Sequence, residues 1–257
     1  MTEREKTTLK RIRTGSFERR LSLTRTGLLA GTRYMAQSAS SLLLPRARRA
    51  EHRRAALGAQ ARYLVEELGK LKGSVVKIGQ MMALYGEHFL PDEVTVALHV
   101  LEDRTVALEW PVIRRVLERE LGRQRLAELD IDPVPIGAAS LGQVHLARRL
   151  ADDRALCLKV QYPGVADSID ADIDAVVRML ELGRMVAPTE EFRSWLEEVR
   201  EMLHREVDYT LEAAKTQLFH ERLKRDPRFV VPEVVPEYSS AHVLATSFEQ
   251  GYAVTSA

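Results

Sequence analysis

The stretch GAASLGQVHLA, residues 137–147, decides how the middle of this 257-residue chain folds. It fits the phosphate-binding loop pattern G-x-G-x-x-G-x-V at every fixed position except the third, where Ala139 replaces glycine. A methyl group there narrows the accessible backbone conformations but leaves the N–H donors that bind anions. Two interpretations stand: a modified phosphate-binding loop, and a small-residue turn between strands with no ligand. Taken alone, the stretch favours the ligand-free turn.

The residues that follow predict a β-hairpin. GQVHLARR (142–149) and ALCLKVQ (155–161) are β-like runs, and the polar LADDR (150–154) between them has hairpin length. Alternation along the second strand places Cys157 and Lys159 on one face and apolar residues on the other. A lysine in this strand favours the phosphate-binding interpretation, because protein kinases follow their glycine-rich loop with a strand lysine that reaches the nucleotide phosphates.

A lysine inside an apolar strand is costly to bury without a partner, so a carboxylate is expected beside Lys159. The alternative is a lysine at an exposed sheet edge. The segment REVDYTLEAAK (205–215) offers the carboxylate, because Asp208 and Glu212 lie one turn apart on one face of the predicted helix. Glu206 points elsewhere, and ordinary solvated helix acids remain the alternative for all three. This helix is expected to run without a break over about residues 190–223.

A further motif lies in LKGSVVKIGQMMA (71–83), inside a helix predicted over about residues 55–85. Gly73 and Gly79 each cost a helix roughly 1 kcal/mol relative to alanine, which suggests close approach of another group. Lys77 and Gln80 project from the same side of this helix. Plain helix packing is the alternative.

The order of predicted elements favours an α+β fold with a small antiparallel sheet packed against helices. Residues 55–122 have helical periodicity, including a helix that begins near Pro111 and ends at Gly122. Helical periodicity returns at about 165–188, and the segment 228–251 contains extended runs broken by prolines.

The composition, 45% hydrophobic and 29% charged, allows a normal packed core. The single cysteine excludes an internal disulfide framework and a cysteine-based zinc site. Residues 1–54 hold 14 Lys and Arg against 4 Asp and Glu, while the rest of the chain holds 24 against 33. This basic arm is either a contact for an anionic membrane or nucleic acid, or a solvated leader. Nucleic acid is disfavoured, because the arm has only Phe17 and Tyr34 for stacking.

The most apolar part of the arm, residues 21–44, is interrupted by Arg25 and Arg33 and predicts no transmembrane span. An amphipathic helix at a membrane surface remains open. The expected location is therefore cytoplasmic, either free or peripheral to a membrane.

Four motifs together resemble the ABC1/UbiB/ADCK (AarF) family of atypical protein-kinase-like proteins. They are KIGQ (77–80), AASLGQVH (138–145), LCLKVQYPGV (156–165) and EVDYTLEA (206–213), and their order and spacing agree over roughly residues 55–251. The resemblance implies a kinase-like N-lobe, a small sheet plus an αC-type helix, with a family-specific helical extension. The implied domains are the arm at 1–54, the extension at 55–130, and the N-lobe at 131–257 with a helical insertion near 165–188.

The resemblance also implies ATP or ADP with Mg²⁺ as cofactors, and a role in ubiquinone or related isoprenoid-quinone biosynthesis, with a quinone-pathway lipid or protein as partner. Lys159 would contact the phosphates and pair with Glu212, and Glu206 and Asp208 are the implied metal ligands. Lys77 and Gln80 would lie across the pocket from which a protein substrate normally enters, near these two acids. The implied nucleotide-binding residues are Gly137, Ala138, Ala139, Ser140, Gly142, Gln143, Val144, Cys157 and Lys159.

Three departures from the family pattern limit the expected function. Cys157 replaces the small alanine that usually lines the adenine site, and Ser247 stands where a hinge acid is common. No H-R-D-like loop or D-F-G motif precedes the last residue, Ala257, so a C-lobe is expected to be absent from this chain. The expected function is thus the ATP-binding part of an atypical kinase or ATPase. The alternative is a non-catalytic, pseudokinase-like half-domain that binds a membrane or a protein.

Overall fold

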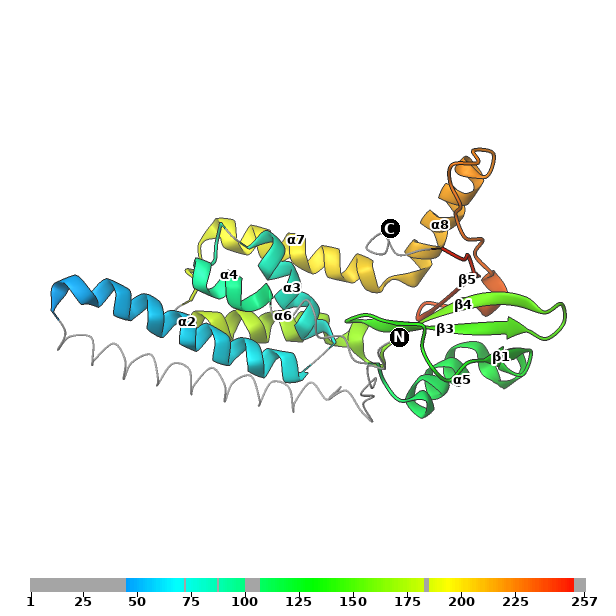
Figure 1. Cartoon of the computed structure of the whole chain (residues 1–257), viewed down its shortest axis with the longest axis horizontal. Helices are drawn as coiled ribbons and strands as arrows, with labels where there is room; N and C mark the ends of the chain where they lie inside the picture. The colour runs from blue at the N-terminus through cyan, green and yellow to red at the C-terminus, as the bar shows by residue number, and fades with distance from the viewer. Residues whose placement is uncertain (1–44, 72, 87, 100–106, 183–184, 252–257) are drawn as a thin grey trace. The chain divides into compact units, whose positions relative to one another are not determined.

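The computed structural model describes residues 45–71, 73–86, 88–99, 107–182 and 185–251. These residues form two compact units (Figure 1). The sheet unit lies within Val106–Pro163 and Arg205–Ala257, and the helical unit lies within Ile12–Thr105 and Gly164–His204. The α+β class with a small antiparallel sheet is confirmed. The domain boundaries expected at 54/55 and 130/131 stay predictions, and residues 1–44 of the basic arm lie outside the described residues.

The sheet unit is built on an antiparallel sheet in the order β1-β3-β4-β5, with β2 paired to β3 (Figure 1). The predicted hairpin is confirmed, because β3 and β4 pair along their whole length from Gly142↔Gln161 to Arg149↔Arg154. Asp153 in the connecting turn has φ of 59°, a left-handed conformation that aspartate tolerates better than most residues. The strands are β1 Leu129–Ile131, β2 Gly137–Ala138, β3 Gly142–Arg149, β4 Arg154–Gln161 and β5 Val243–Ser247.

The two faces of this sheet are covered by different helices. α5 (Trp110–Leu126) packs against β4 on one side, and α8 (Tyr209–Leu223) contacts β5 on the other (Figure 1). Leu156, Leu158 and Val160 are fully buried, so the apolar face predicted for β4 is confirmed. Lys159 lies on the other face of β4 and pairs in register with Leu244 of β5. The short 3₁₀ helix η2 (Pro236–Tyr238) precedes β5.

The predicted end of the helix at Gly122 is wrong by four residues. Gly122 itself is non-helical, with φ of 75° and ψ of 160°, but helical turns resume beyond it as far as Leu126. Glycine adopts this positive φ without the steric cost that a side chain would add. The sequence therefore located the interruption correctly but not the end of the element.

The helical unit contains α2 (Arg46–Leu71), α3 (Ser74–Tyr85), α4 (Asp92–Leu98), α6 (Val165–Leu182) and most of α7 (Glu190–Val207). The prediction of a single helix over residues 55–85 is wrong, because the helical conformation is interrupted before Ser74. Gly73 there has φ of 66° and ψ of −136°, outside the helical region and accessible chiefly to glycine. In contrast to the close approach that the sequence suggested, this glycine permits a turn. Among the described helices, none is long and apolar enough to cross a membrane.

A buried polar cluster joins α3 to α6 within the helical unit. Ser74 Oγ donates to a carboxylate oxygen of Asp172 and lies 3.0 Å from Ser168 Oγ. All three residues are almost completely buried, and burying a carboxylate is tolerated only when hydrogen bonds compensate it. The cluster therefore fixes where α3, which carries the KIGQ motif, packs on α6.

The long helix expected over 190–223 is also wrong, because α7 ends at Val207 and α8 begins at Tyr209. Asp208 separates them with φ of −85° and ψ of 89°, and its side chain caps α8 by accepting hydrogen bonds from the N–H groups of Thr210 and Leu211. Aspartate is among the best residues for this position. Because both segments have helical periodicity, the sequence pattern did not reveal the interruption at Asp208.

Candidate functional site

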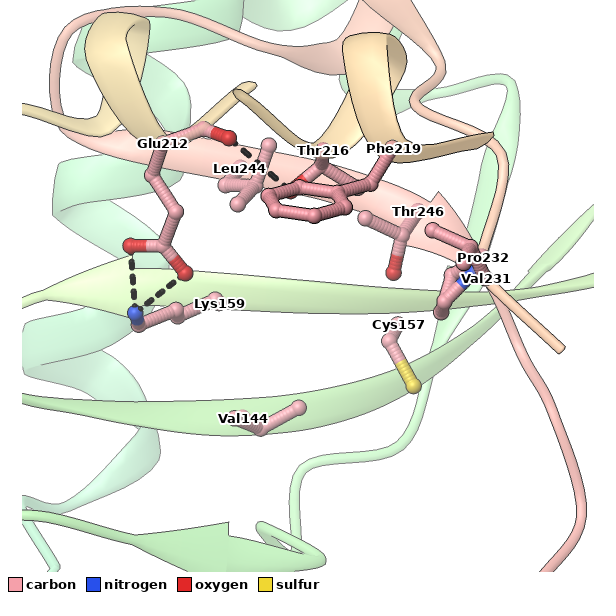
Figure 2. Close-up of a pocket in the computed structure, with 10 residues that line it drawn as sticks. All are labelled: Val144, Cys157, Lys159, Glu212, Thr216, Phe219, Val231, Pro232, Leu244 and Thr246. Carbon is pink, nitrogen blue, oxygen red and sulfur yellow. Dashed lines mark hydrogen bonds and ion pairs between the residues drawn. The ribbon is translucent and has the colours of Figure 1, made fainter. Parts of the chain in front are cut away.

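Lys159 and Glu212 form an ion pair in the sheet unit (Figure 2). Lys159 Nζ donates to both carboxylate oxygens of Glu212, each at 2.7 Å. β4 presents the lysine on the face that α8 covers, and α8 carries the glutamate in its first turn. The two side chains are 36% and 38% exposed, so a ligand can reach both. The carboxylate expected beside the strand lysine is confirmed, whereas its role in binding stays a prediction.

Tyr209 lies next to this ion pair. The Nζ atom of Lys159 is 4.7 Å from the centre of the tyrosine ring, within the range of a cation–π contact. Tyr209 is only 2% exposed and forms a small apolar cluster with Val234 and Leu244. Burial raises the pKa of its phenol above the usual range, so the ring stays neutral. Tyr209 was not predicted as a site residue from the sequence, although its position directly after the motif residue Asp208 was an available signal.

The loop between β2 and β3 is a tight turn in which the N–H of Ala139 donates to the carbonyl of Gly142 at 2.8 Å. Its two glycines differ in the space that is available for a side chain. A Cβ atom on Gly137 would meet nothing within 4 Å, whereas one on Gly142 would lie 2.6 Å from Val160 O and 2.9 Å from Tyr209 Oη. Close approach of the neighbouring strand therefore requires glycine at 142. The turn between strands is confirmed, and phosphate binding by its N–H groups stays a prediction.

A cavity of about 440 Å³ opens beside the ion pair, within the size range of small-molecule sites (Figure 2). Lys159 and Glu212 form its polar end. Val144, Phe219 and Leu244 are among the apolar side chains that line the rest. A site with one charged end and apolar walls suits a ligand that is partly polar and partly apolar.

Several residues that line the cavity were not predicted from the sequence. α8 contributes Glu212, Thr216 and Phe219, at spacings of four and three residues that define one helix face. That spacing was an available signal for the last two. β5 contributes Leu244 and Thr246, which pair with the two cavity residues of β4. No local pattern identifies these two, because they depend on the register of a strand more than eighty residues away.

Gln143 and His145 face the opposite side of β3, where they form a buried hydrogen-bond network. Gln143 Oε1 accepts from the N–H of Leu108 at 2.7 Å, and its Nε2 lies 2.8 Å from His145 Nε2. The carbonyl of Asp132 lies 2.7 Å from His145 Nδ1, so Nδ1 donates and Nε2 accepts from the amide of Gln143. The side chain of Gln143 is thus directed away from the cavity, and its predicted contact with nucleotide would involve its backbone.

Cys157 lines the cavity, and burial raises the pKa of its thiol, which keeps the side chain neutral. Ser247 lies on the other face of β5. Its hydroxyl accepts from the N–H of Glu233 at 2.9 Å and donates to Glu249 at 2.7 Å. Thr246 lines the cavity instead, because neighbouring residues of a strand point to opposite faces.

The two acids of the EVD segment occupy different elements. Asp208 caps α8, and its hydrogen bonds with Thr210 and Leu211 hold the pKa of its carboxyl below the usual value. Glu206 is half-buried near the end of α7. Within the described part of the chain, no group of three or more His, Cys, Asp or Glu side chains could hold a metal ion. The metal role of Glu206 and Asp208 stays a prediction.

Lys77 and Gln80 both lie in α3, in the helical unit, and both are half-buried in a helix whose other residues are mostly buried. They share a side of this helix, as their spacing of three residues predicted. Their expected position across the nucleotide pocket stays a prediction.

A strand lysine bonded to a helix carboxylate beside a cavity is the arrangement with which kinase-like proteins fix their nucleotide-contacting lysine. The sheet unit has this arrangement, which places it in the kinase-like class. Residues 100–257 match the family model described as the ABC1 atypical kinase-like domain. The chain belongs to this family, the ABC1/UbiB/ADCK atypical kinases, as its four motifs predicted.

Similar proteins carry corresponding names. "Atypical kinase COQ8, mitochondrial" of Saccharomyces cerevisiae is 31% identical over 189 residues, which cover 73% of this chain and 38% of that protein. "Atypical kinase COQ8B, mitochondrial" of Danio rerio is 36% identical over 198 residues, covering 75% of this chain and 31% of the relative. A solved Rv3197–erythromycin complex from Mycobacterium tuberculosis matches with a TM-score of 0.47 and 32% identity, over 72% of this chain and 46% of that one. The chain thus spans about a third of the length of the curated relatives it matches.

Proposed function

We propose that the sheet unit is the ATP-binding part of an ABC1/UbiB-type atypical kinase or ATPase. The observation that carries this proposal is the bidentate Lys159–Glu212 ion pair at the polar end of a cavity of about 440 Å³. A lysine fixed in this way presents positive charge to phosphates, while Val144 and Leu244 offer apolar contact to a base. In this assignment the sheet unit is a kinase-like N-lobe, and α8 is its αC-type helix.

The turn after β2 supplies the second phosphate contact in this proposal. The N–H of Ala139 is already bonded to the carbonyl of Gly142, so the donors to phosphate would be the N–H groups of Ser140 and Leu141 in the same turn. Mg²⁺ commonly binds one or two carboxylates together with phosphate oxygens and waters, so Glu206 and Asp208 supply a suitable number of ligands. Magnesium would neutralise charge on the phosphates. The chain's own residues would bind and orient the nucleotide.

Thermal unfolding with and without MgATP tests the nucleotide site. A ligand at about 100 times its Kd stabilises a protein by roughly 2.7 kcal/mol, which shifts the unfolding midpoint measurably. We expect this shift in the full chain and its loss in Lys159→Ala. Lys215→Ala removes an exposed lysine of the same helix that carries Glu212 and is the matched control. An undiminished shift in Lys159→Ala would refute the role of this lysine.

We further propose that the whole protein supports ubiquinone or a related isoprenoid-quinone pathway, as its family membership implies. The basic residues 1–54 would contact an anionic membrane surface through their lysines and arginines. Flotation with vesicles of neutral and anionic lipid, with residues 1–54 present and deleted, tests that contact. Restoration of quinone levels in cells that lack their own family member tests the pathway. Equal flotation of both chains would contradict a membrane role for the arm.

A further inference from the structure

Tyr209 is the main apolar contact of α8 with the rest of the sheet unit. Among the fifteen residues of this helix, all of which the structure describes, only Tyr209 is buried. Its ring forms a cluster with Val234 and Leu244, and Ala213 packs against that cluster at the next helical turn. Glu212 follows Tyr209 by three residues on the same rigid helix. The position in which the Tyr209 ring packs therefore sets the position of the Glu212 carboxylate.

The same ring contacts two other parts of the site. Lys159 Nζ lies 4.7 Å from its centre, so the ammonium group is attracted by both the ring and the carboxylate of Glu212. At its far end, Tyr209 Oη closes the space above Gly142, where an added Cβ would be 2.9 Å away. The side chain of Tyr209, a residue of the same helix as Glu212, thus lies against both the Lys159 ammonium group and the end of the turn at Gly142.

We propose that Tyr209 is a positioning residue that fixes the Lys159 ammonium group and the first turn of α8 relative to each other. It does not line the cavity, so it acts through Lys159 and Glu212 and does not contact the ligand itself. Positioning of the ammonium group requires the aromatic ring, because an aliphatic side chain can fill the apolar cluster but offers the ammonium group no negatively polarised face. As a function of the nucleotide site, this inference rests on the proposed function.

The test measures Lys159 itself, without nucleotide. The rate at which N-hydroxysuccinimidyl acetate acylates Lys159 in the full chain is followed by peptide mass spectrometry. Tyr209→Leu and Tyr209→Met keep an apolar side chain but remove the ring, whereas Tyr209→Phe keeps the ring. Tyr238→Leu is the matched control, since Tyr238 is equally buried in the same unit and bonds Glu128 instead.

We expect the leucine and methionine variants to be acylated roughly 2- to 5-fold faster, the fold-change that a cation–π contact of ordinary strength represents. Tyr209→Phe and Tyr238→Leu should match the parent chain. Unchanged rates in both ring-less variants would overturn the proposal, as would an equal rise in Tyr238→Leu, which indicates general loosening. An equal rise in Tyr209→Phe would assign the effect to the hydroxyl and also overturn it. If one ring-less variant does not fold, the other still decides.

A second measurement separates this inference from the proposed function. The MgATP-induced shift of the unfolding midpoint is recorded for the parent chain and the same variants. A parent chain without a shift refutes the nucleotide site, while the acylation rates still decide the role of Tyr209. A parent chain with a shift that Tyr209→Leu and Tyr209→Met retain in full refutes positioning by the ring. Loss of the shift in these two, with retention in Tyr209→Phe, supports it.

Discussion

Replacing Gly142 by alanine should destabilise the sheet unit strongly, whereas the same change at Gly137 should not. The added Cβ at 142 would lie 2.6 Å from the carbonyl oxygen of Val160 and 2.9 Å from Tyr209 Oη. The first obstacle is backbone of β4, a strand that is paired with β3 on one side and with β5 on the other, so relief requires moving a strand. Overpacking of this kind typically costs about 1–3 kcal/mol, and a backbone obstacle places Gly142→Ala at the upper end, near 3 kcal/mol.

Gly137→Ala is the matched control, because the same methyl group at the other end of the turn meets nothing within 4 Å. We expect a change of no more than about 0.5 kcal/mol in the free energy of unfolding. Urea unfolding followed by tryptophan fluorescence measures both. The chain has two tryptophans, Trp110 in the sheet unit and Trp195 in the helical unit. A Trp195→Phe background therefore leaves a reporter in the sheet unit alone.

With a urea m-value of about 2 kcal/mol/M, a loss of 3 kcal/mol moves the midpoint down by roughly 1.5 M. Equal midpoints for the two alanine variants would refute the close approach at Gly142. A loss at Gly137 larger than at Gly142 would show that the turn, rather than the contact with β4, constrains these glycines.

Three further predictions concern single side chains. Asp208→Ala removes the cap of α8 and should cost about 1 kcal/mol in urea unfolding, while Asp208→Ser, which can still cap, should cost much less; equal losses would contradict the capping role. Burial lowers the pKa of His145 in the folded protein below its usual 6.5, so the unfolded chain takes up a proton first as the pH falls. Stability should therefore decline below about pH 6.5, by at most about 1.4 kcal/mol at pH 5.5, the limit for a histidine that stays neutral when folded, and this part of the decline should vanish in His145→Phe; a decline of the same size there would contradict it. Cys157 lines the cavity, so saturating MgATP should slow its alkylation by iodoacetamide several-fold, and equal rates with and without nucleotide would place the nucleotide elsewhere.

Local chemistry was enough to locate the hairpin and the candidate partners of Lys159. The alternation of Leu156, Leu158 and Val160 fixed which face of β4 is buried, and thereby which face presents Lys159. The cost of burying a lysine then required a carboxylate, and residue type and period offered Asp208 and Glu212. Only the resemblance to the family singled out Glu212.

Breaks between elements were harder to predict, and the two helices expected to be continuous are each divided. Gly73 and Asp208 interrupt segments whose apolar periodicity continues on both sides. Periodicity reports which face of a segment is apolar and is insensitive to one residue that leaves the helical conformation. The positive φ of Gly73 and the capping bonds of Asp208 appear only once the backbone direction on each side is known.

The sequence by itself determined the α+β class, the hairpin, the strand lysine and the family, because each depends on neighbours along the chain or on motif order. The tertiary structure alone decided that the Tyr209 ring lies beside the Lys159 ammonium, that Leu244 and Thr246 line the cavity, and that glycine is required at 142 but not at 137. The physical reason is distance along the chain. These contacts join β3, β4, α8 and β5, which are far apart in the sequence. They depend on the register of the strands and on the packing of the helix, which no local sequence pattern specifies.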